Sequence, residues 1–477
     1  MSSLASPSSP TDGLPDDVLE EIFLACLPTP TNDCEINACE APLLLGRICR
    51  QWRTVSLSAP RLWTSLRIAE PHPPPITIAD LNLRGLADYI PPASHSEKLA
   101  RMADAVKAWL DRSGQCPLSL TFESEPLFDG SGASATSPLL DTLLLFASRW
   151  QRASIKAPIS VLAQLLLLEA ADVPMLREAE VVAKGRGDTF AWNSLKFLHC
   201  ASLRSFGAFG VGHRYRDLPM PLWDHLFDLR MTGMMPSDAL SWVLARCAQL
   251  RSCQVVLGGR RGPPDVPPTI VCEYLESLDI QFQARLTLQS TVQIEFARLS
   301  LPKLRRLKVH SGGWEVQDDI DYGPIFAASP AVTSLDVNVG LFTASSFPQF
   351  LRGLPPTIEE LRINGAPPHS FQKRSKIFDD EALAVLIPSS YESGSQVGCP
   401  NLQVFQADAS FSDEMLLAFV GSRMASRVPL ARVAVCLRDE SGDERVDIRE
   451  LEDVRTFIEA GLLLEVSYYR PEWVDFC

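Results

Sequence analysis

Four cysteines close to the N-terminus have the most suggestive chemistry, because clustered thiolates can bind zinc. They are Cys26, Cys34, Cys39 and Cys49. Their spacing is irregular, no CxxC pair occurs in the chain, and Cys26 and Cys49 fall at apolar positions of predicted helices. We therefore interpret them as small core cysteines rather than zinc ligands. The 12 cysteines are scattered singly, which is typical of a reduced cytosolic or nuclear protein.

Other motifs that carry chemistry are absent or incomplete. Gly207, Gly210 and Gly212 form the sequence GAFGVG, which misses the dinucleotide-binding fingerprint and is more typical of a loop between repeats. No Walker loop, HExxH or GxSxG motif is present. The seven histidines are dispersed singly, so no nucleophile–base pair can be proposed. The sequence thus predicts no catalytic residue, no cofactor and no bound metal.

The charge balance and the short apolar runs limit the classes of partner. A net charge of −14 argues against a nucleic-acid-binding surface, which needs a basic face. The basic run Lys373–Lys376 is more typical of a solvated loop than of a nuclear localisation signal. Apolar runs such as Val161–Leu168 are too short to span a membrane. The Ser/Pro-rich segment Met1–Gly13 has no signal-peptide core, so we expect a disordered leader before a folded cytoplasmic or nuclear protein.

Two amphipathic helices are predicted within residues 14–66. The first begins at Pro15, which suits the first turn of a helix, and ends before Pro28. A polar loop, Thr29–Glu40, separates it from a second helix that begins near Pro42. The apolar residues of this second helix form one stripe: Leu44, Leu45, Ile48, Cys49, Trp52 and Val55. Two such short helices cannot bury both stripes on each other, so we expect exposed apolar surface that binds a partner.

The residues of these two helices resemble the two halves of an F-box. Leu14–Phe23 (LPDDVLEEIF) is similar to its start, and Ile48–Arg53 (ICRQWR) with Ala59–Trp63 (APRLW) is similar to its second half. Trp109–Leu120 and Ser148–Trp150 are similar to segments downstream of the F-box in many fungal members. The resemblance implies binding to the Skp adaptor of SCF (Skp–cullin–F-box) ubiquitin ligases, which are cullin–RING ligases. The implied contact residues are Leu14, Pro15, Val18, Leu19, Ile22, Phe23, Ile48, Cys49 and Trp52.

A motif of the form Leu-x-x-Leu-x-(Val/Ile) recurs in the C-terminal half. Four clear copies, spaced 29, 28 and 26 residues apart, begin at Leu275, Leu304, Val332 and Ile358. Looser copies begin at Leu195, Leu226, Leu250 and Leu402. This spacing is typical of leucine-rich repeats, in which each unit adds one strand to a stack and neighbouring units bury each other's apolar edges. The larger step before the last copy predicts an insertion near residues 365–400.

The alternating residues of the four clear copies are expected to face outward from their strands. They form a strip of mixed charge that we predict to contact a target protein; the alternative is a merely solvated face of a sheet. These residues are Ser277, Asp279, Arg306, Lys308, Ser334, Asp336, Glu360 and Arg362. Only Asn338 and Asn364 lie near the usual asparagine-ladder position, so we expect an irregular solenoid.

The sequence as a whole predicts an α/β chain of three folded parts. These are an N-terminal all-helical F-box (residues 14–66), a helical and strand linker that caps the solenoid (67–170), and an irregular leucine-rich-repeat-like solenoid (171–477). The predicted function is that of a substrate-recognition adaptor, which holds an unidentified target for ubiquitin transfer by other subunits. Two alternatives remain open: a repeat scaffold without a role in ubiquitination, and an enzyme, which would need a clustered polar site in the fold.

Overall fold

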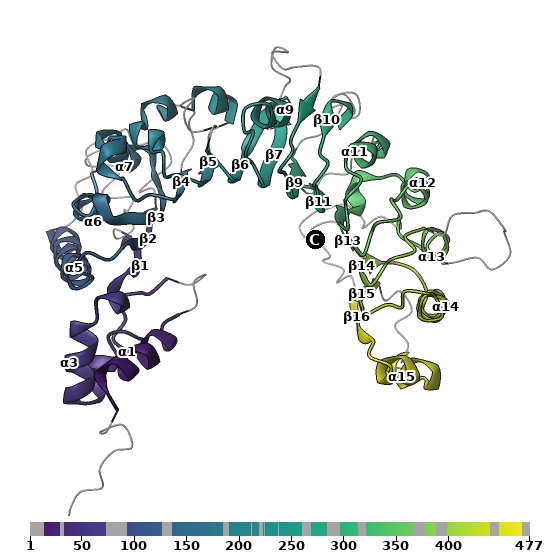
Figure 1. Cartoon of the computed structure of the whole chain (residues 1–477), viewed down its shortest axis with the longest axis horizontal. Coiled ribbons are helices and arrows are strands. Elements are labelled where there is room, and N and C mark those ends of the chain that lie inside the picture. The colour runs from purple at the N-terminus through teal and green to yellow at the C-terminus, as the bar shows by residue number, and fades with distance from the viewer. Residues whose placement is uncertain are drawn as a thin grey trace, which may run out of the picture. The chain divides into compact units, whose positions relative to one another are not determined.

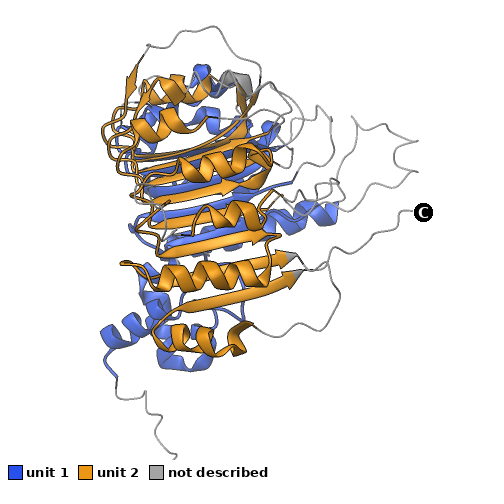
Figure 2. Cartoon of the chain, turned by 90° about the vertical axis from the view of Figure 1, so that its right-hand side faces the viewer, with its two compact units in different colours: residues 1–225 blue, residues 226–477 orange. Residues whose placement is uncertain are grey.

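The structure is a computed structural model, and the chain divides into two compact units, residues 1–225 and 226–477 (Figure 2). It describes residues 14–28, 33–72, 93–125, 136–184, 190–210, 212–218, 223, 225–236, 238–259, 269–283, 296–312, 321–365, 377–387, 398–438 and 448–469. The predicted leader (1–13), the basic run at 373–376 and most of the predicted insertion lie outside these residues.

Unit 1 begins with short helices and continues as strands that alternate with helices. Its elements are α1 (Asp16–Ala25), α2 (Leu45–Ile48), α3 (Arg50–Ser58), η1 (Pro60–Trp63), β1 (Ser65–Ala69), α5 (Ala93–Arg112), β2 (Leu118–Glu123), α6 (Pro138–Leu144), η3 (Ala147–Arg149), β3 (Trp150–Pro158), α7 (Ile159–Leu162), η4 (Ala163–Leu167), η5 (Ala170–Asp172), β4 (Glu178–Lys184), η6 (Trp192–Ser194), η7 (Lys196–His199), β5 (Ser205–Phe209) and η8 (Gly212–Asp217). Strands β1 to β5 are parallel and pair in chain order.

Unit 2 repeats the same alternation more regularly. Its elements are β6 (Asp228–Pro236), α9 (Ala239–Leu244), β7 (Ser252–Gly259), β8 (Ile270–Val271), β9 (Ser277–Phe282), β10 (Leu299–Ser300), β11 (Arg306–Ser311), α11 (Gly323–Ala328), β12 (Ser334–Asn338), η9 (Val339–Leu341), α12 (Ser346–Arg352), β13 (Glu360–Asn364), α13 (Asp380–Ala384), β14 (Val404–Ala409), α14 (Asp413–Met424), β15 (Arg432–Arg438), η10 (Ile448–Glu450), α15 (Glu452–Glu459) and β16 (Leu463–Tyr469). Apart from β8 and β10, which pair with each other, the strands form one parallel sheet in chain order. The labelled helices of the unit lie along one face of this sheet (Figure 1).

The four clear motif copies coincide with strands β9, β11, β12 and β13. Their second leucines, Leu278, Leu307, Leu335 and Leu361, stand opposite one another in the register of the sheet. These leucines, and the valine or isoleucine two residues later, are at most 1% exposed. Because side chains alternate along a strand, this spacing sends all the apolar residues into a core shared by neighbouring repeats.

One asparagine links three consecutive repeats of unit 2. The Asn338 side chain is 4% exposed, and its oxygen accepts hydrogen bonds from the Ser311 hydroxyl (3.1 Å) and the Gly340 N–H (2.8 Å). Its amide nitrogen donates to the Gly365 carbonyl at 2.6 Å. The Asn338 side-chain amide thus hydrogen-bonds backbone groups at the ends of the strands, as an asparagine at the ladder position of a leucine-rich repeat does.

The predicted fold class is wrong, because the N-terminal helices do not form an all-helical domain. Helix η1 leads directly into β1, and the loop between α1 and α2 joins the edge of the same sheet. There, the Arg67 N–H donates to the Cys34 carbonyl at 2.7 Å, and Glu35 forms a parallel bridge with Arg67. The described chain is an α/β repeat fold whose parallel strands already begin at Ser65, and no periodicity in the loop reveals that its residues are extended.

Two further contacts fix the N-terminal helices to the sheet of unit 1. The Asp33 carboxylate accepts hydrogen bonds from the hydroxyls of Ser65 (2.8 Å) and Thr121 (2.5 Å), on β1 and β2. The rings of Trp63 and Trp109 meet edge to face with centroids 4.8 Å apart, and Trp109 Nε1 donates to the Trp63 carbonyl at 3.1 Å. The helices and the first strands therefore share one core.

The looser motif copy proposed at Leu195 is also wrong. That segment is the 3₁₀ helix η7, and the strand, β5, follows it with Phe206 and Ala208 buried. A leucine pair three residues apart also suits a 3₁₀ turn, in which such residues share a face. Gly207, predicted to lie in a loop, is part of β5.

Candidate functional site

Helix α1 carries two adjacent apolar stripes with different environments. Leu19 and Phe23, four residues apart, are fully buried. Val18 and Ile22 precede them by one residue each and are 41% and 40% exposed, and Cys26 extends their row and is also exposed. Because residues four apart lie above one another on a helix, the second row is a continuous exposed apolar stripe.

The predicted second helix is broken at Cys49 into α2 and α3. The Cys49 backbone is extended (φ −151°, ψ 176°), and its Sγ accepts the Trp52 N–H at 3.4 Å as the N-cap of α3. Periodicity did not reveal the break because cysteine also counts as an apolar residue. As a result Ile48 is 56% exposed, whereas Leu45 and Val55 are buried.

The structure separates the nine predicted adaptor-contact residues into two groups. Leu19 and Phe23 belong to the core, and the half-buried Trp52 packs on Phe23 with ring centroids 4.9 Å apart. The other six are exposed or, for Leu14, half-buried, and we call them the exposed helical residues: Leu14, Pro15, Val18, Ile22, Ile48 and Cys49. The sequence alone does not distinguish the groups, because both consist of apolar residues at helical spacing.

Of the four cysteines of this region, only Cys34 is the small core residue that the sequence suggested. Cys34 is buried, and burial, with the neighbouring Asp33 charge, raises the pKa of its thiol to about 11. Cys26, Cys39 and Cys49 are exposed. Across the described ranges, no three His, Cys, Asp or Glu side chains are grouped so that they could hold a metal ion.

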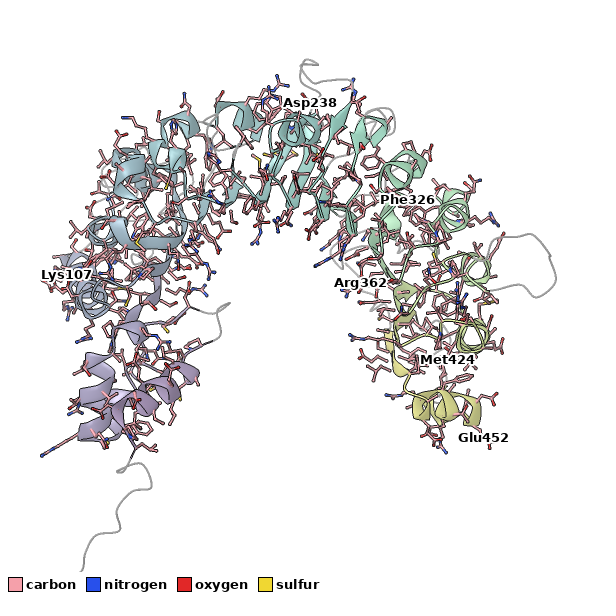
Figure 3. The ribbon with its side chains drawn as sticks, in the orientation of Figure 1. Lys107, Asp238, Phe326, Arg362, Met424 and Glu452 are labelled. Atoms are coloured by element: carbon pink, nitrogen blue, oxygen red, sulfur yellow. The ribbon has the colours of Figure 1, made fainter. Side chains whose placement is uncertain are left out.

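The eight predicted target-contact residues form two straight rows across four strands of unit 2. Their places in the register of β9, β11, β12 and β13 are Ser277–Arg306–Ser334–Glu360 and Asp279–Lys308–Asp336–Arg362. All eight are exposed or half-buried, and Arg362 lies on the strand side, away from the helices (Figure 3). We call these two rows the strip.

Much of the charge on the strip is already paired within it. Lys308 Nζ lies 3.8 Å from an Asp279 carboxylate oxygen, and Arg362 binds Glu360 at 2.5 Å. The Ser334 hydroxyl also donates to Glu360, at 2.7 Å. Arg306 is exposed and stands in register between Ser277 and Ser334. A partner would therefore meet a surface of fixed, alternating charges.

Two residues that were not predicted as target contacts also belong to this face of the strands. His310 Nε2 lies 2.8 Å from Asp336, and Asn364 Nδ2 donates to the same carboxylate oxygen at 2.5 Å. Both follow the motif's last Val or Ile by one residue, so the next alternate position of the motif was the available signal. The structure thus brings one histidine to a carboxylate, which dispersed positions in the sequence did not suggest.

Burial and hydrogen bonding shift the pKa values of two strip carboxylates in opposite directions. Burial raises the pKa of Asp279, against the opposing charges of Lys308 and His310. Burial also acts to raise the pKa of Glu360, but hydrogen bonds from Ser334 and Arg362 outweigh it and the net shift is downward. Glu360 is therefore held as a carboxylate by its neighbours.

Comparison with known proteins gives only distant similarity, among solved structures. No protein-family model and no curated protein matches the chain. Among solved structures it is similar to the "Crystal structure of Rad7 and Elc1 complex in yeast", with 13% identity and a TM-score of 0.34, over 73% of this chain and 90% of that chain. This likeness does not define a function for the chain. The part of the chain that the structure describes contains no helix both long and apolar enough to cross a bilayer.

Proposed function

We propose that the chain is a non-catalytic substrate-recognition adaptor. Its N-terminal helices dock on the Skp-type adaptor of a cullin–RING ubiquitin ligase, and the strip of unit 2 contacts a target protein. Ubiquitin transfer is performed by other subunits, and the chain contributes by raising the effective concentration of the target near the transfer site. The resemblance of the N-terminal residues to an F-box supports the identity of the adaptor.

The observation that carries this proposal is the exposed apolar stripe of α1. Val18 and Ile22 remain about 40% exposed although the neighbouring Leu19 and Phe23 are fully buried. Burying an apolar side chain of this size contributes about 1.5–3 kcal/mol when it is fully removed from water. Together with the exposed Ile48, the stripe offers the apolar anchors that stable interfaces use.

The direct experiment is calorimetric titration of the full chain with purified Skp adaptor. Ile22→Asp combined with Ile48→Asp is expected to weaken binding about 30-fold or more, because truncated apolar anchors cost about 2 kcal/mol or more. Both side chains are exposed, so the circular dichroism of the variant should match that of the natural sequence. Trp52→Ala would weaken binding too, but it also removes the packing on Phe23.

Leu167→Asp is the matched control, since Leu167 is 77% exposed in the same unit but lies outside the F-box-like residues. It should bind the Skp adaptor as tightly as the natural chain. Equal weakening by both substitutions, or none in the double variant, contradicts the docking proposal.

A cellular experiment separates a ligase adaptor from a repeat scaffold. Proximity labelling with and without proteasome inhibition identifies candidate targets, and depletion of the chain should then raise their abundance. Arg306→Glu with Arg362→Glu, on the strip, should prevent this turnover while capture of the Skp adaptor continues. Captured partners whose abundance never changes would indicate a scaffold without a role in ubiquitination.

A further inference from the structure

The outer edge of β16 ends the sheet of unit 2. On its inner side β16 pairs with β15, and the Leu463 N–H donates to the Ala431 carbonyl at 3.0 Å. Backbone groups alternate in direction along a parallel strand, so the N–H and C=O of Leu464 and Val466 point to the outer side. No strand among the described residues pairs with that side.

The core-facing side chains of β16 are less buried than those of β15. In β15, Val433 and Val435 are at most 3% exposed between neighbouring strands. Their register partners on β16, Leu464 and Val466, are only half-buried. The core-facing apolar side chains of β16 therefore lack a neighbouring strand on their outer side.

The other described sheet edge, in unit 1, indicates what completes such an edge in this protein. There β1 is covered by an extended piece of loop, which inserts Cys34 beneath the sheet with 2% exposure. The next residue, Glu35, faces outward and approaches Arg67 of the strand at 4.0 Å. The covering segment thus combines an apolar residue below the sheet with a charge opposite to that of the strand above it.

The same pattern at β16 requires a basic segment. The charged residue on the outward face of β16 is Glu465, whose side chain is 64% exposed even though Arg432 binds it from β15 at 3.1 Å. The adjacent helix α15 adds exposed Glu452, Asp453 and Glu459 against Arg455 (Figure 3 labels Glu452). An incoming strand with lysine or arginine beside Glu465 would continue the cross-strand pairing of opposite charges seen elsewhere in this sheet.

We propose that the outer edge of β16 binds an extended segment of a partner protein, added as the next strand. The segment is apolar at alternate positions and basic in between. Backbone hydrogen bonds to Leu464 and Val466 supply affinity, the half-covered apolar layer receives the alternate side chains, and Glu465 selects for positive charge. This surface lies in unit 2, and the inference does not depend on docking of the Skp adaptor.

The experiment uses the full chain and a synthetic heptapeptide in which valine alternates with lysine, with a glutamate version as its control. Fluorescence anisotropy should give about threefold or greater preference for the lysine peptide, and Glu465→Lys should reverse it. Val466→Pro removes an outward N–H without removing a hydrogen bond to β15, and it should weaken binding about tenfold. Val466→Ala keeps the N–H and should weaken binding clearly less.

Amide exchange of the chain alone provides the second readout. The Leu464 and Val466 amides should exchange much faster than the Val433 and Val435 amides, and the lysine peptide should slow them. Slow exchange at Leu464 and Val466 without peptide would mean that another part of the chain covers the edge, which overturns the proposal. Equal affinity for both peptides, or for Val466→Pro and Val466→Ala, would overturn it as well.

Discussion

In the N-terminal helices of unit 1, exposed apolar residues lie directly beside apolar residues of the core. In strands β9, β11, β12 and β13 of unit 2, by contrast, the apolar residues are buried and the outward residues are polar. Val18 and Ile22 are about 40% exposed, but Leu335 and Val337 are fully buried. Apolar anchors supply most binding energy, while paired charges mainly set orientation and choice of partner. Under the proposed function, the apolar helices would supply the binding energy for the Skp adaptor, and the charged strip would select the target.

The largest effect should come from the buried stripe of α1. Phe23→Ala removes a fully buried ring that packs on Trp52, and we expect a loss of about 3–5 kcal/mol of stability. Ile22→Ala, one residue away and 40% exposed, should cost less than about 1 kcal/mol. Hydrogen exchange of the α1 and α3 amides in the full chain measures both. Similar losses would mean that the two stripes do not differ as described.

A smaller effect is expected at the polar link between repeats. Asn338→Ala leaves the Ser311 hydroxyl, the Gly340 N–H and the Gly365 carbonyl without their partner, so unit 2 should lose about 1–3 kcal/mol. Asn364→Ala is the control, because that side chain is only half-buried. Exchange of the β11 to β13 amides should accelerate in the first variant and change little in the second. Equal acceleration in both variants would contradict the role of Asn338 in linking the repeats.

A still smaller loss of stability is expected where the loop at Asp33 contacts the first strands of the sheet. Asp33→Ala removes the acceptor of the Ser65 and Thr121 hydroxyls, and about 1 kcal/mol of local stability should be lost. The Arg67 amide, which bonds the same loop, should then exchange faster. Glu35→Gln serves as the comparison, because it removes only the exposed ion pair between Glu35 and Arg67, whose charged atoms are 4.0 Å apart. It should leave exchange of the Arg67 amide unaffected. An unchanged exchange rate of the Arg67 amide in Asp33→Ala would contradict the claim that Asp33 holds this loop on the sheet.

The smallest predicted effect concerns the strip and depends on pH. The pKa of Glu360 is lowered in the folded chain, so its carboxylate stabilises the fold above the pKa of the unfolded chain, and this contribution is lost as the pH falls through the lower folded value. Glu360→Gln should thus cost less than about 1 kcal/mol at pH 7 and nothing at strongly acidic pH. Thermal unfolding of both chains across this range tests it; a difference that persists at acidic pH would show that charge is not the cause.

The sequence revealed those parts of the fold that depend on repeated leucines. The motif placed β9, β11, β12 and β13, and its alternation placed the strip. The looser copies at Leu226, Leu250 and Leu402 coincide with β6, β7 and β14. Strand β1 was not recognised because the first motif position needs apolar bulk rather than leucine: Trp63-x-x-Leu66-x-Ile68 gives β1, and those three residues are at most 1% exposed. The extended loop at Asp33 left no periodic signal, so the sequence predicted an all-helical N-terminal part and missed its contact with the sheet.

The candidate site was predictable only as a list of apolar residues. Helical spacing selected Val18 and Leu19 alike, and only tertiary packing decides that one is 41% exposed and the other fully buried. The position of His310 beside Asp336 depends on a diagonal contact between neighbouring strands, which register alone does not specify. Such contacts depend on long-range packing, and short sequence patterns carry little information about it.

Hydrogen-exchange mass spectrometry of the full chain with purified Skp adaptor can locate the docking surface. In the complex, protection should appear at residues 14–26 and 44–52, while the strands of the strip should exchange as they do in the free chain. Absence of a complex, or protection that omits α1 and appears elsewhere, would contradict the docking proposal.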